Sequence, residues 1–479
     1  MFFHEIINQS TPTNTAIKSN GEIITYSMLN EYIERYRSYF NKIGIKPGDY
    51  VGLFYNNSPE FIYSYFAVSK MGAIIVPFNR MLTSNEIEYI ANDTNMKHII
   101  TMATIDISTK YTQIVLPAVI SEIMKTKIIE LDQIDRSEDD VNTIIYTSGT
   151  TGKPKGAMLT HKNLISNAKS IIEYFSLNQK DIHLCVLPMF HSFAWTVNVA
   201  AALHSGACIL IKDSFTPKNI INDINNEKVT IVTGVPAMFS YYLSLGIESD
   251  FASVRLFISG GDSLPVEVLK SFEYKFDKKI YEGYGLSETS PVVAVNPPNA
   301  IRPGSVGLPV PNVNVKIVDN NGKTLNAKEV GEILVKGPNV MKGYRNLPEE
   351  TRKTIVDGWL HTGDIGYMDE DGYIYIVDRI KDIIIVGGMN VYPREIEELL
   401  YQYDGILEAA AVGVQDDKRG EIPMAYIVVK NKETFNLNGL KIFLRDNLAK
   451  FKRPKKIVLM DQLPKNATGK IMKRKLQAN

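Results

Sequence analysis

The sequence predicts an α/β fold: a large N-terminal domain of layered, mostly parallel sheets with a β-rich subdomain, then a small mobile α+β C-terminal domain. Three observations support this prediction. Up to about residue 260, short apolar runs alternate with amphipathic stretches, a pattern typical of parallel sheets covered by helices. Between about 305 and 377, alternating runs are separated by Gly, Asn and Asp turns, which favours hairpins. The final part, of roughly 100 residues, returns to helices and strands.

The first strand–helix unit of the α/β part is expected at 50–71, where an apolar run at 50–54 is followed by an amphipathic stretch at 59–71. A strand followed by a helix is the unit from which parallel sheets are built. Further strands are expected at 73–77, 98–101, 184–187, 207–211 and 230–233. No apolar run approaches the roughly 18 residues of a membrane-spanning helix, so we expect no integral membrane segment.

The β-rich subdomain is expected over about 305–377, with strands at 313–318, 331–336 and 373–377. The charged stretch that follows, 379–381, is predicted to be a hinge between domains formed by residues 1–378 and 382–479. In the C-terminal domain the periodicity predicts two helices and two strands, at 393–403, 409–414, 424–429 and 437–450.

The charge balance and the cysteine content exclude several functions. Lys and Arg total 53, as do Asp and Glu, so no net charge favours nucleic acid as a partner. Two cysteines, Cys185 and Cys208, in 479 residues suit a reducing compartment, and both lie in apolar runs typical of core positions. We expect a cytoplasmic protein, while peripheral membrane contact and a homodimer both stay open.

A run of Gly, hydroxyl and Lys residues directly follows the apolar run 143–146, which is typical of a buried strand. A loop over 147–156 would offer backbone N–H groups, hydroxyls and ammonium groups to a polyphosphate. It differs from the kinase-type phosphate loop, because Lys153 is followed by Pro154 and not by the Ser or Thr that holds Mg²⁺. The predicted phosphate-binding residues are Thr147, Ser148, Gly149, Thr150, Thr151, Gly152 and Lys153.

Four further stretches carry side chains that suit a nucleotide. Residues 284–289 supply an aromatic ring, a carboxylate and a hydroxyl. Residues 361–364 are expected to form a tight turn that carries an acid, and this acid could accept both hydrogens of a ribose diol. Residues 378–381 carry charges at the predicted hinge, and 466–470 place a lysine near the C-terminus. Taken singly, each stretch also has an ordinary structural interpretation. In the same order, these are a solvated surface acid, a routine turn, a salt-bridged linker and a mobile tail. Their joint occurrence in this order is specific.

Together these stretches resemble the adenylate-forming superfamily, which contains acyl-CoA synthetases, luciferases and the adenylation domains of peptide synthetases. The resemblance covers nearly the whole chain and includes 66–73, the Gly260–Gly261 turn, 304–309, 343–345 and 387–390. It implies an enzyme that joins a carboxylic acid to the AMP part of ATP and releases pyrophosphate. A thiol, such as that of CoA, then displaces AMP.

For the nucleotide, the resemblance implies that Tyr284 stacks on adenine and that Asp364 binds the ribose hydroxyls with Arg379 beside it. Thr147 and Glu288 would place Mg²⁺. The base pocket would be lined by Gly261, Glu282, Gly283 and Gly285.

For catalysis, the resemblance implies that Lys470 offsets negative charge where the carboxylate meets the α-phosphate, and that Thr289 touches this phosphate. The C-terminal domain would then rotate about Lys381. This rotation would withdraw Lys470 and bring Gly387 and Gly388 against the pantetheine of CoA.

The identity of the acid depends on the acyl-pocket segment 188–195. Amino-acid-activating family members carry an Asp early in such a segment, whereas this one contains no acid, and a buried unpaired ammonium would be costly. Its pattern resembles fatty acyl-CoA synthetases, which implies that Trp195 gates an acyl tunnel, that His191 positions the carboxylate or opens the acyl site, and that Gly260 borders the acyl group. A plain core aromatic is the alternative for Trp195. Residues 196–206 are mostly apolar and small, so they could line an acyl channel or form part of the core.

We therefore predict an ATP- and Mg²⁺-dependent acyl-CoA ligase for a medium- or long-chain fatty acid. The alternative is a stand-alone adenylation enzyme that loads an acyl or aryl acid onto a carrier-protein thiol. Chain length follows from pocket depth and not from a motif. Asp262 follows the glycine pair where family members often have a small residue, so it could alter substrate choice or cap the helix expected near Pro265.

Overall fold

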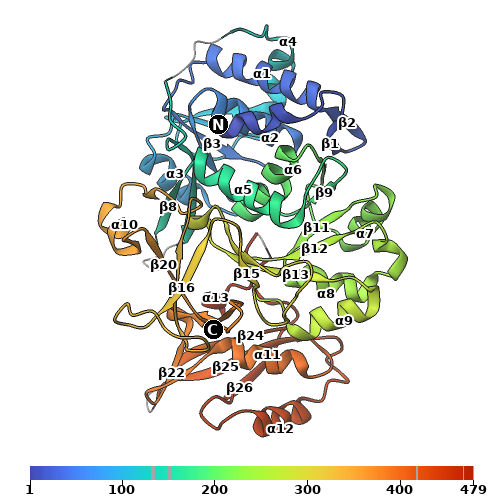
Figure 1. The fold of residues 1–479 in the computed structure, drawn as a ribbon, viewed down its shortest axis with the longest axis vertical. Helices are drawn as coiled ribbons and strands as arrows, with labels where there is room; N and C mark the ends of the chain where they lie inside the picture. The colour runs from blue at the N-terminus through green and yellow to red at the C-terminus, as the bar shows by residue number, and fades with distance from the viewer. Residues whose placement is uncertain (131–134, 149–152, 417–418, 468, 478–479) are drawn as a thin grey trace.

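The computed structural model describes residues 1–130, 135–148, 153–416, 419–467 and 469–477. Figure 1 shows an elongated molecule with α1 and α4 at one end and the residues after about 380 at the other. The described strands form four sheets. Within the same residues, no helix is long and apolar enough to cross a membrane.

The largest sheet has nine strands in the order β15-β14-β13-β12-β11-β9-β10-β1-β2. The pairs from β13 to β1 are parallel, whereas β13–β14, β14–β15 and β1–β2 are antiparallel. The strands are β1 (Thr15–Ser19), β2 (Glu22–Thr25), β9 (Ile182–Cys185), β10 (Cys208–Ile211), β11 (Ile231–Gly234), β12 (Leu256–Ser259), β13 (Ile280–Gly285), β14 (Val292–Val295) and β15 (Leu308–Pro309).

The second sheet has seven strands in the order β18-β8-β7-β4-β3-β5-β6. It is parallel except where β8 pairs with β7 and β18. The strands are β3 (Tyr50–Phe54), β4 (Ile74–Pro77), β5 (His98–Thr101), β6 (Thr112–Val115), β7 (Val141–Ser148), β8 (Pro154–Thr160) and β18 (Gly343–Tyr344). The predicted layered and mostly parallel α/β architecture is confirmed. The antiparallel pairs β1–β2, β7–β8 and β13–β14 join consecutive strands through short connections, whereas β18 is added to β8 from a distant part of the chain.

Helices fill the space between the two large sheets and cover their outer faces. Residues of α5 (His161–Phe175) and of the π-helical segment η2 (Ala194–Ala200) pack on both sheets, whereas α7, α8 and α9 pack on the other face of the nine-stranded sheet. The bounds are α1 (Tyr26–Lys42), α2 (Pro59–Lys70), α3 (Ser84–Asp93), α4 (Leu116–Lys125), α6 (Ala201–His204), α7 (Pro217–Asn226), α8 (Pro236–Leu245), α9 (Val266–Phe276) and α10 (Pro348–Thr354).

The local sequence explains why α5 begins at its observed position. The Thr160 hydroxyl accepts from the Asn163 N–H at 3.1 Å, and the Asn163 side chain accepts from the Thr160 N–H at 2.8 Å. This reciprocal cap satisfies donors that the first helical turn would otherwise leave unpaired. Apolar residues then recur every three or four positions, so that one face is buried: Leu164, Ala168, Ile171 and Phe175.

The third sheet is the predicted β-rich part, and all of its pairs are antiparallel. One expectation there is wrong: residues 361–364 do not form a tight turn but lie within a ten-residue strand, β20. β20 pairs with β17 on one side and with β21 on the other, which keeps it extended, and shifts of register beside residues 361–366 mark an irregularity. The strands are β16 (Asn314–Val318), β17 (Gly331–Lys336), β19 (Ile355–Val356), β20 (Trp359–Met368) and β21 (Ile374–Arg379).

The small C-terminal part contains the fourth sheet, in which β22, β23, β24 and β25 pair antiparallel and β26 joins β25 in parallel. Two helices pack against this sheet through buried apolar residues, which include Ile396, Leu400, Leu440 and Leu444. The exact domain boundaries and the hinge at 379–381 stay predictions. The elements are β22 (Ile384–Val386), β23 (Met389–Val391), β24 (Ile406–Asp416), β25 (Gly420–Val429), β26 (Lys456–Leu459), α11 (Pro393–Gln402), α12 (Leu437–Asn447) and α13 (Lys473–Gln477).

Candidate active site

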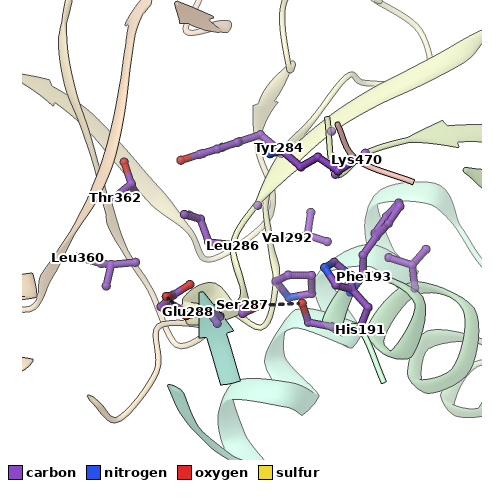
Figure 2. A pocket seen from close by; sticks show the side chains of 18 of the residues that line it. His191, Phe193, Tyr284, Leu286, Ser287, Glu288, Val292, Leu360, Thr362 and Lys470 are labelled. Atoms are coloured by element: carbon purple, nitrogen blue, oxygen red, sulfur yellow. Dashed lines mark hydrogen bonds between the residues drawn. The ribbon is translucent and has the colours of Figure 1, made fainter. Parts of the chain in front are cut away.

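A cavity of about 530 Å³ lies where the nine-stranded sheet, the β-rich sheet and the C-terminal part meet. It opens beside the carboxyl ends of β12 and β13, the edge of a parallel sheet at which ligands bind in many α/β proteins. Figure 2 shows Tyr284 and Lys470 along one side of the cavity, and Glu288 and His191 along the opposite side.

Eleven predicted site residues lie together in the lining of this cavity, although they are far apart in the sequence. They come from the hairpin β7–β8, from the segment before η2, from the ends of β12 and β13, and from both sides of the predicted hinge. They are Thr147, His191, Gly260, Gly261, Gly283, Tyr284, Gly285, Glu288, Arg379, Lys381 and Lys470.

The glycine pair after β12 is required by the backbone and by close packing. Gly261 has a φ of +85°, a left-handed conformation that residues with a Cβ adopt only with strain. A Cβ at Gly260 would lie 3.1 Å from the ring of Phe193. The glycines therefore let this part of the chain border the cavity without filling it.

Tyr284, Asp364 and Arg379 form one hydrogen-bonded group beside the cavity. The Tyr284 hydroxyl donates to Asp364 Oδ2 at 2.6 Å, and Arg379 Nε donates to Asp364 Oδ1 at 2.7 Å. Asp364 and Arg379 are direct partners in the β20–β21 ladder. Burial raises the pKa of Tyr284 well above its usual range, with the Asp364 charge acting in the same direction. The phenol therefore stays protonated, and the group fixes the orientation of the tyrosine ring.

Thr147 and Glu288, which the sequence predicts as the Mg²⁺ pair, are in contact. Thr147 Oγ1 donates to Glu288 Oε1 at 3.3 Å, and the Tyr344 hydroxyl donates to the same oxygen at 2.9 Å. Among the described residues, no group of three or more His, Cys, Asp or Glu side chains could hold a metal ion. Mg²⁺ is commonly bound by one or two carboxylates together with substrate phosphates and water, so this donor set fits Mg²⁺ that arrives with ATP.

The phosphate-binding loop is shorter than the sequence predicts. Residues 147–148 and 154–156 do not belong to a loop, because β7 extends to Ser148 and β8 begins at Pro154, and these two residues are partners in the β7–β8 ladder. A proline is tolerated at the first position of a strand, where its missing N–H is not needed. Lys153 is exposed, whereas Lys155 lines the cavity and pairs with Glu350. Gly149, Thr150, Thr151 and Gly152 lie outside the described residues.

His191 reaches the cavity from the segment between β9 and η2, and its Nδ1 accepts from the Phe193 N–H at 3.3 Å. Burial, assisted by the positive charge of Lys470, lowers the pKa of His191 to about 4 from its ordinary 6.5. The imidazole is therefore neutral at physiological pH and can act as a hydrogen-bonding group without adding charge.

The lowered pKa of His191 should be directly visible, because the imidazole should not take up a proton near neutral pH. In protein labelled with ¹⁵N at histidine, the His191 signal, identified by its loss in His191→Gln, should show no protonation above about pH 5. Between about pH 6.5 and pH 4 the unfolded chain takes up this proton before the folded chain does, so His191 lowers stability as the pH falls through that window. A midpoint near 6.5 would contradict the neutral role.

Lys470 enters the cavity from a short loop of the C-terminal part. The Lys470 N–H donates to Asn466 Oδ1 at 3.0 Å, and the Asn466 N–H donates to the Lys470 carbonyl at 2.9 Å. This pair of bonds closes the loop on itself. In Figure 2 the Lys470 side chain lies beside Tyr284 and across from the elements that carry His191.

Other predicted site residues lie outside the cavity lining, and the buried Asp364 is one of them. The Thr289 hydroxyl is buried and donates to the Pro291 carbonyl. Glu282 is buried with its side chain directed to the Leu264 N–H. Gly387 and Gly388 are exposed in the β22–β23 hairpin.

Trp195 also lies outside this lining and within an aromatic cluster. Its ring is 3% exposed, and its centroid lies 3.9 Å from that of Tyr65 and 5.7 Å from that of Phe61. The following small residues are buried core, and of 196–206 only Val197 lines the cavity. This placement matches the core alternative for Trp195.

Sequence reasoning missed several lining residues. Ile171 and Phe175 of α5 and Val292 of β14 border the cavity, but apolar residues beside a cavity follow the same period as those in a core. Tyr344 was part of a recognised stretch without a role, and its hydrogen bond to Glu288 is a tertiary contact.

Comparison with known proteins gives the family. Residues 5–345 match the family model described as AMP-binding enzyme, and residues 395–470 match AMP-binding enzyme C-terminal domain. A long-chain-fatty-acid–CoA ligase of Bacillus subtilis (strain 168) is 34% identical over 97% of this chain and 91% of that protein. A feruloyl-CoA synthase of an Amycolatopsis species is 33% identical over 97% and 95%. ATP-bound MatB from Rhodopseudomonas palustris has a TM-score of 0.91 at 31% identity, over 100% of this chain and 99% of that chain.

The chain belongs to the AMP-binding enzyme family. Family models match both the large N-terminal part and the small C-terminal part. Its activity class is that of an AMP-forming acid–CoA ligase, with ATP and CoA as substrates.

Proposed function

We propose that this ligase activates a medium- or long-chain fatty acid. The supporting observation is one wall of the cavity, which we name the acyl wall, because every side chain in it is apolar. α5, η2 and two strands of the nine-stranded sheet, β12 and β14, contribute to it. Its residues are Ile171, Phe175, Val197, Ile258, Val292 and Val295.

The acyl wall suits an alkyl chain for energetic reasons. Each buried methylene contributes about 0.8 kcal/mol, whereas an ammonium or a second carboxylate placed there would lose its hydration without gaining a partner. The charged side chains of the lining, such as Glu288, Arg379 and Lys470, lie with the residues assigned to nucleotide and carboxylate. An acid with one charged end and one apolar end is therefore favoured.

For the nucleotide we propose that adenine lies against Tyr284 and that the ribose hydroxyls bind beside Asp364 and Arg379. Thr147 and Glu288 would hold Mg²⁺ together with the phosphates of ATP. The ion would neutralise phosphate charge during the first step. The contact of Thr147 with Glu288 at 3.3 Å supports this assignment.

The reaction we propose has two steps. A carboxylate oxygen attacks the α-phosphorus of ATP, the bond from that phosphorus to the bridging oxygen breaks, and pyrophosphate leaves. Lys470 would offset the negative charge that gathers there, while neutral His191 orients the carboxylate. The C-terminal part then turns about Lys381, and the CoA thiolate attacks the acyl carbon and displaces AMP. Matches to CoA ligases favour CoA over a carrier-protein thiol as acceptor.

A screen of acids tests this proposal. With ATP, Mg²⁺ and CoA, we expect AMP and pyrophosphate as products, and kcat/KM should rise about fourfold per added methylene until the acyl wall is filled. Ferulate and coumarate serve as aryl comparisons of similar size. A preference for the aryl acids over every linear acid would reject the fatty-acid assignment, and formation of ADP would reject the reaction itself.

A further inference from the structure

Arg394 on α11 links the C-terminal part to the strand before the predicted hinge. Its Nη1 donates to the Ile376 carbonyl at 2.7 Å, and its backbone N–H donates to Asp378 Oδ2 at 3.1 Å. Both acceptors belong to β21. The Arg394 side chain is 13% exposed, and hydrogen bonds from a charged donor with little access to water are stronger than neutral ones.

Glu398, one turn further along α11, faces the start of a helix of the N-terminal part. Helix α9 begins after Pro265 and has no side-chain cap of its own. Glu398, Arg394 and Pro265 line the same small cavity between the two parts. A carboxylate near the start of a helix meets the positive end of the helix dipole. Arg394 Nε lies 3.8 Å from Glu398 Oε1, so their opposite charges attract each other only loosely.

Arg394 also acts on a buried acid, Glu282. Glu282 Oε1 accepts from the Leu264 N–H at 3.0 Å, whereas its Oε2 has no hydrogen-bond partner within the described ranges. Burial raises the pKa of Glu282 to about 7, and the positive charge of Arg394 opposes that rise. The seating of α11 therefore influences an acid in β13, the strand that also carries Tyr284.

The same helix anchors the segment that carries Lys470. Glu397 Oε1 lies 2.7 Å from Lys473 Nζ, and Glu397 also accepts from the Ala411 N–H at 2.7 Å. Lys465, on the other side of Lys470, pairs with Glu408 of β24. Since Lys470 lies between an anchor on α11 and an anchor on β24, Lys470 should move together with α11 when the C-terminal part turns.

We propose that Arg394 and Glu398 form a latch that holds the C-terminal part where Lys470 reaches the cavity, and that both are positioning residues for adenylate formation. The proposal rests on the two-step reaction proposed above. Turning the C-terminal part away from α9 breaks the two hydrogen bonds of Arg394 to β21 and removes the Glu398 carboxylate from the start of α9. The latch thus favours the first half-reaction and has to open before the second.

The half-reactions separate this role from a structural one. In Glu398→Ala and Arg394→Ala, single-turnover adenylate formation should fall about 3- to 10-fold, as expected for losing one polar contact. Transfer from supplied acyl-adenylate to CoA should be unchanged or faster, and KM for ATP unchanged. Glu398→Gln, which keeps the size and polarity of the side chain, should lose less of the rate than Glu398→Ala. Glu395→Ala is the matched control, because Glu395 on the same helix pairs only with Lys452 of the C-terminal part among the contacts described, at 2.7 Å.

A distance measurement tests the latch without any acid. Dyes on Tyr274→Cys of α9 and Ile442→Cys of α12, both exposed side chains, report the orientation of the C-terminal part by energy transfer. Glu398→Ala should shift the distribution to longer or broader distances, and Glu395→Ala should not. Equal loss in both half-reactions, or an unchanged distribution, would overturn the latch. A wild-type protein that releases no pyrophosphate would reject the proposed function instead, while the dye distances would still decide the latch.

Discussion

Replacement of Lys470 by alanine is expected to slow adenylate formation by about 10²- to 10³-fold and to leave acyl transfer to CoA nearly unchanged. When the carboxylate meets the α-phosphate, two anions approach, and a fixed ammonium that faces this point stabilises the transition state. Lys470 is positioned for this because it lines the cavity whose opposite side carries His191 and Glu288. In the second half-reaction the thiolate attacks an uncharged acyl carbon, and the proposed turn about Lys381 has by then withdrawn Lys470, so Lys470 should contribute little there.

The two half-reactions can be measured separately. Pyrophosphate release in a single turnover reports the first, and thioester formation from purified acyl-adenylate and CoA reports the second. Lys430→Ala is a suitable control, because this lysine is 65% exposed and pairs only loosely with Asp404, at 3.8 Å. A comparable loss in both half-reactions would show that Lys470 supports the fold or the binding of substrates and not the first chemical step.

Replacement of Asp364 by alanine is expected to raise KM for ATP by about 10²-fold. Hydrogen bonds to a charged group contribute roughly 1.5–3 kcal/mol each, and Asp364 accepts one from Tyr284 and one from Arg379. Without the carboxylate the Tyr284 ring loses its fixed orientation, and Arg379 loses its ion pair. The predicted contact of Asp364 with the ribose would be lost as well.

Calorimetric binding of AMP or ATP measures the Asp364 effect without chemistry. Asp364→Asn keeps the shape of the side chain and one acceptor oxygen, so its loss should be smaller. Asp404→Ala is the control, since the Asp404 side chain is fully exposed. If Asp364→Ala binds nucleotide as tightly as the wild type and only its thermal stability falls, then the group of three residues is structural.

Both predictions concern one cavity that is assembled from two parts of the chain. Asp364 of β20 lies behind the lining and holds Tyr284 and Arg379, whereas Lys470 belongs to the C-terminal part beyond the predicted hinge. A variant of Asp364 should therefore alter nucleotide binding in either orientation of the C-terminal part. A variant of Lys470 should matter only while α11 is seated against α9 and β21.

The sequence correctly predicted those features that depend on local pattern. The apolar run at 98–101 forms β5, the run at 331–336 forms β17, and the helix expected from residue 393 is α11. The sequence did not reveal how strands pair over long distances. Residues 361–364 were expected in a turn, but pairing with both β17 and β21 draws them into β20.

The candidate site divides in the same way. Residue type and order were enough to identify Thr147, Glu288, Tyr284 and Lys470 as candidates, because their chemistry suits ATP and a carboxylate. The structure brings these four to one cavity. It places Thr289 behind the lining instead, because its hydroxyl is engaged with the Pro291 carbonyl, which no local pattern reveals.

By itself, the sequence determined the α/β class, the order of most strands and helices, and the superfamily resemblance, since alternation and motif order are local properties of the chain. Only the tertiary structure decided that Phe175 borders a cavity while Trp195 packs among aromatic rings, and that Glu398 faces the start of α9. The physical reason is that core and cavity residues share the same periodicity. Which of them meets empty space, or a partner on a distant helix, depends on how the sheets and helices pack.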